Sequence, residues 1–548
     1  MNSKLRIGIL LNTETVPAWA KEMIVKILAI QQIDLVLVIY NGRTGTHPAG
    51  KQRRKISFFY RLYRKLDNYF FGSDNDALIQ SDISGLLTGI PAIVVTPVIE
   101  NKNEYFKEED ITVVKNHNLD VLIKIGFGSL AGGITTVSKY GVWELYNSNR
   151  YNSMDGFAAV AECFNKIETT YSILHCIPAD GGLGTILYYS KSMTDIYSVT
   201  RNLNRYYWKS MNFVPRLLIL LVKNGGDWFW NYIETYQQVE TIPAKYLIPQ
   251  HFFMPVVLVK MIWRSLEKKA TELFFIQQWQ LRVFVQDDDR PIPAAAEFKK
   301  IVPPKTCFWA DPHLIIQDNK RYVFFEELPF NTNVGHLAAF EIDEEGNHST
   351  PVKILEKPFH LSNPFIMEYQ GSFFMIPETG QDKTIQLYKC DSFPYKWEFV
   401  MNLMENINAV DCTLIFHDDT WWLFANVITN KGISGLDELF IFYSPCFPTN
   451  KWISHQLNPV LSDATKARPA GAFFRQHNKL YRPSQSSTKI YGTSIKINEV
   501  LQLNTEHYKE RTADTIAPDF DKNILGVHSF SKKEGVAVID TLVKRFRY

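Results

Sequence analysis

Four polar residues stand at equivalent positions in the C-terminal half of this 548-residue chain: Asp311, Asn363, Asp411 and Arg468. Each lies at the start of a segment that continues as an apolar strand, a polar turn and an aromatic strand. Carboxylates can act as acid and base on a glycosidic bond, and a guanidinium binds an anionic group through two bonds. We therefore predict a sugar site in which Asp311 and Asp411 are catalytic and Asn363 and Arg468 bind substrate.

The later strands of these segments add further candidates. The aromatic strand carries Glu326 and Glu327 in the first segment and Glu378 in the second, while the fourth carries Arg482. We predict Glu378 as a third catalytic residue, and Glu327 and Arg482 as substrate-binding residues. Two histidines of this half, His313 and His528, are interpreted as core or rim residues.

The segments recur at a nearly constant interval. The residues that directly follow the four polar positions are 52, 48 and 57 residues apart: Pro312, Pro364, Cys412 and Pro469. A degenerate fifth copy, LGVHSFSKKEGVAVIDT, begins at Leu525. This period fits one four-stranded propeller blade. We predict an all-β five-bladed propeller over residues 279–548, with the polar positions gathered around its central channel.

The first 237 residues alternate strand and helix signals instead. Apolar runs typical of strands in a buried parallel sheet are separated by helical spacing: Leu5–Leu11, Asp34–Tyr40, Ala92–Val98 and Asp120–Gly126. The alternation predicts an α/β doubly wound domain over residues 1–237. Residues 238–278 are predicted to connect the domains through a helix over Pro255–Phe275. We interpret this helix as buried, with contact to a membrane surface as the alternative.

Composition narrows the class of protein. Lys and Arg number 59 against 57 Asp and Glu, and this balance argues against a nucleic-acid partner. The six cysteines contain no CxxC pair, so we predict no metal site and a reducing compartment. The N-terminus lacks the pattern of a signal peptide, and no apolar run reaches the ~20 residues of a membrane span. We expect a cytoplasmic location and leave the oligomeric state open.

The C-terminal half also resembles known proteins. FWADPHLIIQDNKRYVFFEE resembles the first blade of the five-bladed glycosidase superfamily of arabinanases, levansucrases and invertases. This resemblance implies that Asp311 is the general base, that Asp411 tunes the pKa values and that Glu378 is the acid. ETGQDKTIQLYK and VDCTLIFHDDTWWLFAN resemble the propeller domain at the N-terminus of plant glucosamine inositolphosphorylceramide transferases and of many bacterial proteins. That match spans most of residues 279–548.

The N-terminal half resembles another family. DVLIKIGFGSLAGGITTVSKYGVWELYNSN (120–149) and TTYSILHCIPADGGLGTILYYS (169–190) are similar to the N-terminal domain of methionyl-tRNA and sugar-nucleotide formyltransferases. That family uses an Asn–His–Asp trio with a folate formyl donor. Asp180 matches the Asp, and Asn147 lies near the Asn–His segment. This segment holds no His, and the nearest one, His175, falls on another strand.

The predicted function is that of an intracellular carbohydrate-active enzyme, a transferase in surface-glycan or glycolipid biosynthesis that acts on a sugar or glycan. A nucleotide-sugar is its candidate cofactor. Two alternatives stay open. One is an amino-sugar (sugar-nucleotide) formyltransferase that uses N10-formyltetrahydrofolate and recognises the glycan with its propeller. The other is a non-catalytic sugar-binding scaffold.

Overall fold

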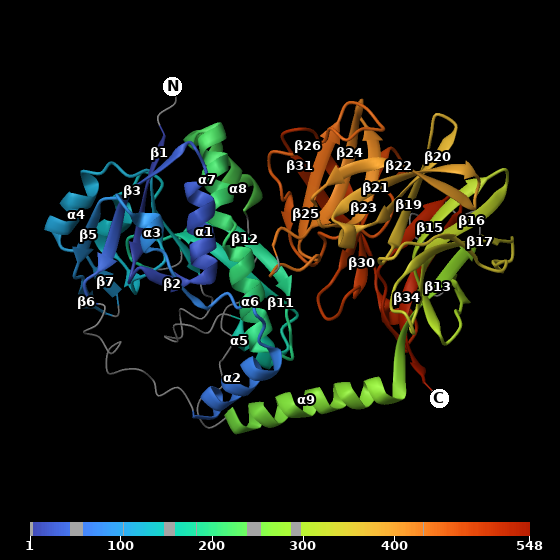
Figure 1. Ribbon diagram of the computed structural model, residues 1–548, viewed down its shortest axis with the longest axis horizontal. Helices are drawn as coiled ribbons and strands as arrows, with labels where there is room; N and C mark the ends of the chain where they lie inside the picture. The colour runs from blue at the N-terminus through green and yellow to red at the C-terminus, as the bar shows by residue number, and fades with distance from the viewer. Residues whose placement is uncertain are drawn as a thin grey trace. The chain divides into compact units, whose positions relative to one another are not determined.

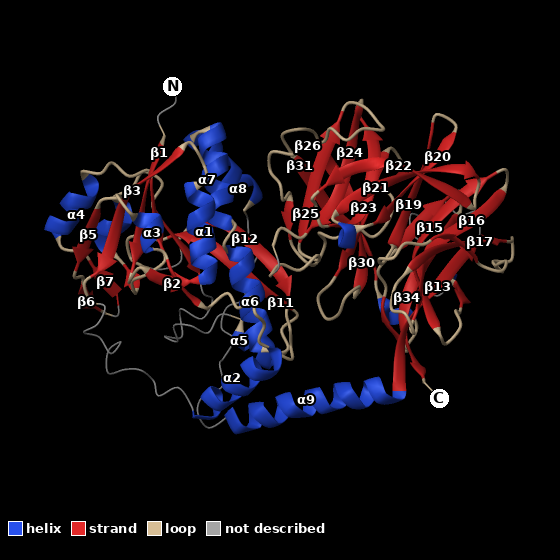
Figure 2. Ribbon diagram, viewed as in Figure 1, coloured by secondary structure: helices blue, strands red, loops and turns tan. Residues whose placement is uncertain are grey.

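The chain forms two compact units. The computed structural model describes residues 4–43, 58–101, 103–146, 159–181, 184–237, 254–285, 297–430 and 432–547. The first unit comprises Met1–Arg264 with Asn430–Ile433, and the second comprises Ser265–Thr429 with Ser434–Tyr548. The first unit mixes helices with strands, whereas the second is built almost wholly of strands (Figures 1 and 2).

The first unit is organised around a seven-stranded sheet. Its strands follow the order β12 (Ile186–Met193), β11 (Thr169–Cys176), β10 (Val142–Tyr146), β8 (Val121–Lys124), β1 (Leu5–Leu11), β3 (Ile33–Asn41) and β5 (Ala92–Val95). The strands from β10 to β5 pair in parallel, while β11 and β12 join antiparallel. The four strand-like runs of the sequence are therefore β1, β3, β5 and β8.

The helices of the described ranges pack around this sheet or extend from it. They are α1 (Ala18–Leu28), α2 (Phe58–Phe71), α3 (Ser84–Leu87), α4 (Glu108–Lys115), α5 (Val160–Asn165), α6 (Val199–Ser210), α7 (Phe213–Asn224), α8 (Gly226–Tyr236) and α9 (Met254–Phe274). Ile111 and Val114 of α4 share a core cluster with Leu10, Leu37 and Leu122 of the sheet. Short strands form two small sheets: β2 (Thr15–Pro17) with β4 (Gln80–Asp82), and β6 (Val98–Glu100) with β7 (Asn103–Tyr105) and β9 (Ser129–Leu130).

Helix α9 lies almost where the sequence predicts it, but it is not a buried helix. Met254 and Met261 are its buried residues, whereas apolar side chains such as Val259 and Trp263 are exposed. The prediction of a buried helix is wrong because α9 is apolar on more than one side, and the core covers one of them. No helix of the described ranges is both long and apolar enough to cross a bilayer.

The described residues of the second unit form five antiparallel sheets, and each of the five sequence repeats lies in its own sheet. The first comprises β15 (Cys307–Gln317), β16 (Lys320–Pro329), β17 (His336–Ile342) and β18 (Val352–Leu355). The second comprises β19 (Ser362–Tyr369), β20 (Ser372–Glu378), β21 (Thr384–Ser392) and β22 (Lys396–Glu405). The third comprises β23 (Ala409–His417), β24 (Thr420–Val427), β25 (Glu438–Ser444), β26 (Ile453–Ser454) and β27 (Leu461–Ser462). The fourth comprises β28 (Phe474–Gln476), β29 (Lys479–Ser486), β30 (Ser494–Leu503) and β31 (Tyr508–Ile516).

The fifth sheet combines the two ends of the second unit. It contains β13 (Phe275–Val285) and β14 (Lys299–Ile301) from the start, and β32 (Ile524–Gly526), β33 (Phe530–Lys533) and β34 (Val536–Phe546) from the end. Strand β13 pairs with β34 along its whole length, from Phe275 opposite Phe546 to Val285 opposite Val536. The pairing ties residues more than 250 positions apart and closes the series of sheets.

Three of the repeats share an irregularity at their polar position. Asp311, Asn363 and Asp411 all have left-handed backbone, with φ of 51°, 41° and 51°, and each coincides with a shift in strand register. Asp and Asn tolerate this conformation better than other residues with a side chain, and a bulge re-aims the side chain that it carries. The recurrence of Asp and Asn therefore has a conformational reason as well as a chemical one.

Candidate functional site

A small cavity of about 180 Å³ in the second unit gathers residues from several of its sheets. It is lined by Trp279, Phe308, Ala310, Asp311, Glu326, His360, Ser362, Glu378, Arg468, Tyr491 and His528. The cavity thus brings together three of the predicted site residues, Asp311, Glu378 and Arg468. Asp411, another predicted catalytic residue, is not in the lining but accepts a hydrogen bond from Arg468.

On one side of the cavity, His528 lies between two carboxylates. Its Nε2 is 3.0 Å from Asp311 Oδ1 and its Nδ1 is 2.8 Å from Asp540 Oδ2. Burial alone would lower the pKa of His528, but the two carboxylates outweigh it and raise this pKa to about 10. Burial opposes ionisation of Asp311 too, yet the His528 charge and the Ser529 hydroxyl, 2.9 Å away, hold its pKa at about 2. Asp311 is therefore a fixed anion at neutral pH.

On the other side, Arg468 lies between Asp411 and Glu378. Its Nε donates to Asp411 Oδ2, which also accepts from Gln485 Nε2 at 2.8 Å. Glu378 Oε2 accepts from the backbone N–H of Asp411 at 3.2 Å and lies 3.8 Å from Arg468 Nη2. Burial and the negative charge of Asp411 raise the pKa of Glu378 to about 8, although Arg468 acts against them. Glu378 is therefore protonated at neutral pH.

Glu326 is a second carboxyl group in the cavity with a raised pKa. Burial, followed by the charges of Asp311 and Glu378, raises this pKa well above the usual value. Its Oε1 is 3.3 Å from His360 Nε2, while His360 Nδ1 accepts a hydrogen bond from the backbone of Gly335 at 3.0 Å. The cavity thus holds the ionised Asp311 beside the protonated Glu378, which is the combination that acid–base chemistry requires.

Aromatic rings complete the wall. The Arg468 guanidinium lies 5.0 Å from the centre of the Tyr491 ring, and that ring lies 5.1 Å from the His528 imidazole. Trp279 packs against both rings, with its centre 4.0 Å from that of His528 and 6.3 Å from that of Tyr491. These flat apolar surfaces beside charged groups suit a ligand that, like a sugar, has both apolar and hydroxyl faces.

Asp311, His528 and Asp540 also form a group whose donor atoms lie within 4.8 Å of one another. Both ring nitrogens of His528 face carboxylate oxygens, and its raised pKa keeps the ring protonated. A metal ion would have to displace that proton, since only a neutral imidazole nitrogen is a ligand. The group is arranged as an ion-pair triad.

Two of the predicted substrate-binding residues, Glu327 and Asn363, are not among the residues that line the cavity. Glu327 points to the opposite side of β16 from Glu326, because successive side chains of a strand alternate. It accepts a hydrogen bond from Trp309 Nε1 at 2.6 Å and lies 3.2 Å from His336. Asn363 donates its backbone N–H to Asp311 Oδ2 at 3.2 Å.

Arg482, also predicted to bind substrate, is buried and is not among the residues that line the cavity. It pairs with Glu510 at 2.8 Å and 2.9 Å and donates to the carbonyls of Lys466 and Ala467. These carbonyls directly precede Arg468, so Arg482 fixes the segment that delivers the Arg468 side chain into the cavity.

The interpretation of His528 as a core or rim residue misses its part in the site. A signal for it was present, since Val527–His528–Ser529 in the fifth repeat aligns with Ala310–Asp311–Pro312 in the first. His528 is thus the fifth member of the polar series. Tyr491 and Trp279 have no equivalent in the repeats, and nothing in the sequence pattern singles them out.

The predicted site of the first unit is described only in part. Asn147 lies outside the described residues. Asp180 is exposed in the loop after β11, whereas His175 is buried within β11, with Nε2 3.6 Å from Glu144 Oε2. Glu144 also pairs with Lys124. His175 thus lies beside Glu144 and, with Lys124, forms a trio of side chains on the neighbouring strands β8, β10 and β11.

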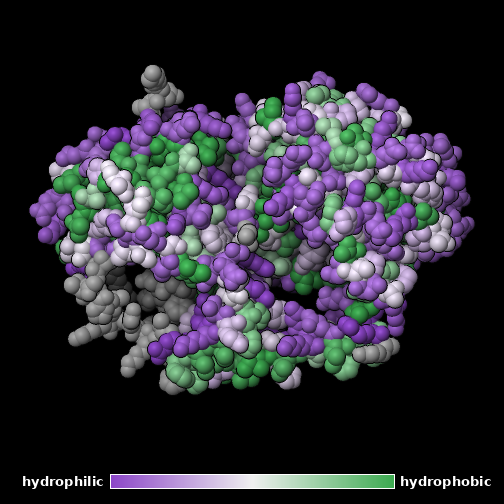
Figure 3. All heavy atoms as spheres, in the orientation of Figure 1, coloured by the Kyte–Doolittle hydropathy of each residue, from purple (hydrophilic) through white to green (hydrophobic). Residues whose placement is uncertain are grey.

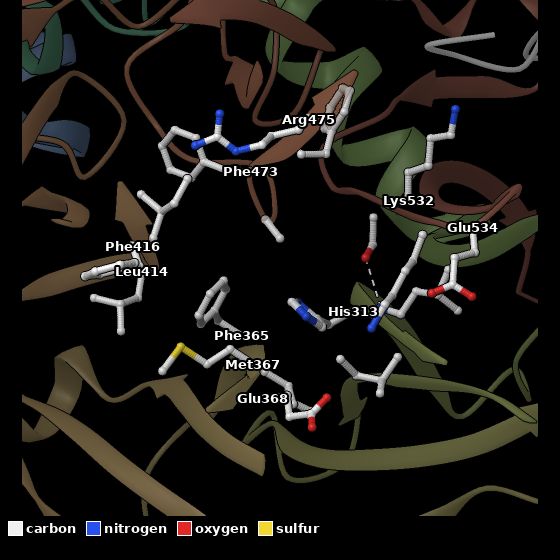
Figure 4. Close-up of a pocket in the computed structure, with 18 of the residues that line it drawn as sticks. His313, Phe365, Met367, Glu368, Leu414, Phe416, Phe473, Arg475, Lys532 and Glu534 are labelled. Carbon is white, nitrogen blue, oxygen red and sulfur yellow. Dashed lines mark hydrogen bonds between the residues drawn. The ribbon is translucent and has the colours of Figure 1, made fainter. Parts of the chain in front are cut away.

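A larger cavity, of about 670 Å³, lies further along the same inner strands (Figure 4). His313, Phe365 and Phe473 point into it, and Arg475 and Lys532 stand at its edge. Burial lowers the pKa of His313 to about 4, so this ring is neutral. The walls of this larger cavity offer apolar and aromatic contacts. The two carboxyl groups with opposite protonation, Asp311 and Glu378, line the smaller cavity instead.

Comparisons with known proteins concern mainly this second unit. Residues 289–527 match the family model described as "Glucosamine inositolphosphorylceramide transferase 1, N-terminal". The protein of that name from rice (Oryza sativa subsp. japonica) is 34% identical over 206 residues, which cover 37% of this chain and 27% of the relative. The Arabidopsis thaliana protein is 30% identical over 223 residues, covering 40% and 29%. The chain therefore matches less than a third of the length of these relatives.

Solved structures with similarity to the chain include two glycoside hydrolases. A family 117 enzyme from Zobellia galactanivorans aligns with a TM-score of 0.32 and 11% identity over 50% of this chain and 91% of its own. An exo-1,5-alpha-L-arabinanase from a bovine ruminal metagenomic library aligns with a TM-score of 0.32 and 16% identity over 44% and 94%.

Proposed function

We propose that this protein is a carbohydrate-active enzyme that transfers a glycosyl group in glycolipid or surface-glycan biosynthesis. In this proposal the five sheets of the second unit are the blades of a propeller, and the reaction takes place in the 180 Å³ cavity on its axis. The cytoplasmic location and the nucleotide-sugar donor inferred from the sequence belong to the same proposal.

The observation that carries the proposal is the opposite protonation of two carboxyl groups in one cavity. The pKa of Asp311 is held at about 2 and that of Glu378 is raised to about 8. Between these values the pair consists of one base and one acid, as displacement at an anomeric carbon requires. Their environments, not their residue types, make this difference.

Each group then has a defined part in the step. The oxygen of an acceptor hydroxyl forms a bond to the anomeric carbon while the bond from that carbon to the leaving oxygen breaks. Asp311 takes the proton of the attacking hydroxyl, and Glu378 gives its proton to the leaving oxygen. Arg468 pairs with Asp411 and stays within reach of Glu378, where it offsets part of the effect of burial and of Asp411 on the pKa of the acid.

The comparisons support the class of reaction through the name of the relatives. The transferase named in the matching family acts, by that name, on inositolphosphorylceramide, a glycolipid precursor. The shared region is the N-terminal part of that protein, so its activity and lipid acceptor enter here only as part of the proposal.

A direct test offers the full chain nucleotide-sugars and simple aryl glycosides as donors, with lipid and oligosaccharide acceptors or water. Product formation that Glu378→Gln abolishes supports the proposal, and the absence of turnover with any donor overturns it. A thermal-shift screen with the same compounds identifies the sugar, since a ligand at 100 times its Kd adds about 2.7 kcal/mol to the stability.

A sugar-binding role without catalysis is the second candidate. It is favoured by the pairing of Asp311 with His528 and of Arg468 with Asp411, because each of these groups already has an opposite charge beside it. Binding that survives Glu378→Gln, without turnover by the unmodified chain, would select this role. The formyltransferase hypothesis has no support from the family match, because residues 289–527 do not include the first unit.

A further inference from the structure

Two helices of the first unit expose apolar stripes to solvent. On α2 the stripe consists of Phe58, Leu62, Leu66 and Phe70, which recur every fourth residue and therefore share one side of the helix. On the first turns of α9 it continues with Val259 and Trp263. Phe58, Phe70, Val259 and Trp263 are each between 65% and 69% exposed. We call these six side chains the α2–α9 face.

The opposite sides of both helices are firmly packed. Tyr63 of α2 and Met254 and Met261 of α9 belong to one core cluster with Phe164 and Leu203. Arg264 at the end of this part of α9 donates to the carbonyls of Cys163 and Phe164 at 3.0 Å and 2.9 Å. The two helices are thus anchored to the same core, and both leave their apolar outer sides exposed. Figure 3 shows hydrophobic side chains gathered where Figure 1 places α9.

Basic residues predominate around the face. Arg61 and Lys65 on α2 and Lys260 on α9 are exposed beside the apolar side chains. The acidic residue of α2, Asp67, is buried and paired with Arg64 at 3.2 Å, while on α9 the exposed Glu267, one turn after Trp263, is followed directly by Lys268 and Lys269. A surface of apolar and aromatic side chains with an excess of basic residues at its edge complements an anionic lipid surface.

We propose that the α2–α9 face binds the surface of an anionic lipid bilayer. The apolar side chains enter the boundary between headgroups and acyl chains, with Trp263 at the headgroup level, while the basic residues contact lipid phosphates. A bilayer fits better than a protein partner because the apolar residues are long side chains on two helices, flanked by cations that a phosphate layer neutralises. The inference does not depend on the reaction, but it would bring a glycolipid-processing enzyme to its substrate.

The test is flotation of the full chain with two kinds of vesicle, one of phosphatidylcholine alone and one containing phosphatidylserine as well. We expect binding to the mixed vesicles, weaker binding to the neutral ones, and a decrease with added salt. The double variant Phe70→Glu/Trp263→Glu should bind the mixed vesicles at least tenfold more weakly, with an unchanged Tm because both side chains are exposed.

A matched control separates this effect from added charge alone. Phe399→Glu/Leu501→Glu replaces two exposed hydrophobic residues of the second unit and should bind as the unmodified chain does. If the first double variant does not fold, Lys65→Gln/Lys260→Gln keeps the apolar stripes and should weaken binding to mixed vesicles about fivefold per charge removed.

Failure to bind either vesicle, or equal binding by the Phe70→Glu/Trp263→Glu variant, overturns the proposal. A dimer in solution that this variant dissociates, without any vesicle binding, would also overturn it and assign the face to a second copy of the chain. Because lipid binding is the measurement, these outcomes are independent of the glycosyl-transfer test.

Discussion

Both units of the molecule gather charged side chains at their sheets, but they use them differently. In the first unit Lys124, Glu144 and His175 lie opposite one another on β8, β10 and β11 of a single sheet. In the second unit Asp311 meets His528 and Asp540 across two sheets, and Asp411 meets Arg468 across two others. Partners within one sheet lie side by side, whereas partners across sheets enclose a cavity.

The two clusters also differ in their electrostatics. In the cavity of the second unit, burial and neighbouring charges move the pKa values of Asp311 and Glu378 apart, to about 2 and about 8. This spread provides a base and an acid at the same pH. The comparison teaches that a buried charge cluster is a candidate active site when its groups differ in protonation and face an open volume.

The largest effect is expected from Asp311→Asn, which tests whether the cavity of the second unit is catalytic. If Asp311 is the base, turnover should fall by ~10²–10⁴-fold, because the near-isosteric amide cannot accept the proton. Glycosyl transfer and Tm are measured on the same sample. Glu327→Gln, on the opposite side of the neighbouring strand, is the control and should keep its activity. A stable Asp311→Asn variant with normal turnover would remove the chemistry from this cavity.

The first unit should show the opposite behaviour. Lys124→Met removes one partner of a buried ion pair, so it should lower the free energy of unfolding by about 3–5 kcal/mol. Turnover of the folded fraction should stay unchanged, since the trio is not in the catalytic cavity. The double variant Lys124→Met/Glu144→Leu should recover most of the loss in denaturant unfolding. A large loss of turnover instead would place chemistry in the first unit.

The protonated His528 predicts a pH dependence of stability. Its folded-state pKa is about 10 against 6.5 for an ordinary histidine, so its contribution is complete below pH 6.5 and is lost as the pH rises through 10. The slope in this window is about 1.4 kcal/mol per pH unit. Urea unfolding at several pH values should show this slope in the free energy of unfolding, and the His528→Gln variant should lack it. If that variant does not fold, Asp540→Asn is the substitute. It removes a charge that raises the pKa of His528, so the loss of stability should end at a lower pH than in the unmodified chain.

The smallest effect expected is a shift in the pH profile. With Glu378 as the acid, kcat/KM should fall as the pH rises through about 8. Asp411→Asn removes a charge that raises the pKa of Glu378 and leaves Arg468, which lowers it, unpaired. The alkaline limb should therefore move to lower pH in this variant. A limb that does not move would mean that another group titrates.

Repeats in the sequence were sufficient to predict much of the candidate site. Asp311, Asp411 and Arg468 were found because the repeat places one polar residue at the start of each inner strand, and Glu378 because it ends the second strand of its repeat. Glu326 could not be separated from Glu327, since the choice depends on which side of β16 faces the cavity. The pairing of Arg482 with Glu510 could not be foreseen, because Glu510 is on a strand that the sequence does not place beside it.

Sequence alone thus determined the local features of this protein: the strand runs of the first sheet, the five repeats, the helix near Pro255–Phe275, and the Asp or Asn at each left-handed bulge. These follow from hydrophobic period and backbone preference, which act over a few residues. Tertiary structure alone decided that β13 closes on β34, that His528 ionises between Asp311 and Asp540, and that Asp311 is charged while Glu378 is protonated. The physical reason is that pairing, burial and pKa depend on neighbours in space, and here those neighbours are up to 271 residues apart along the chain, as Phe275 and Phe546 are.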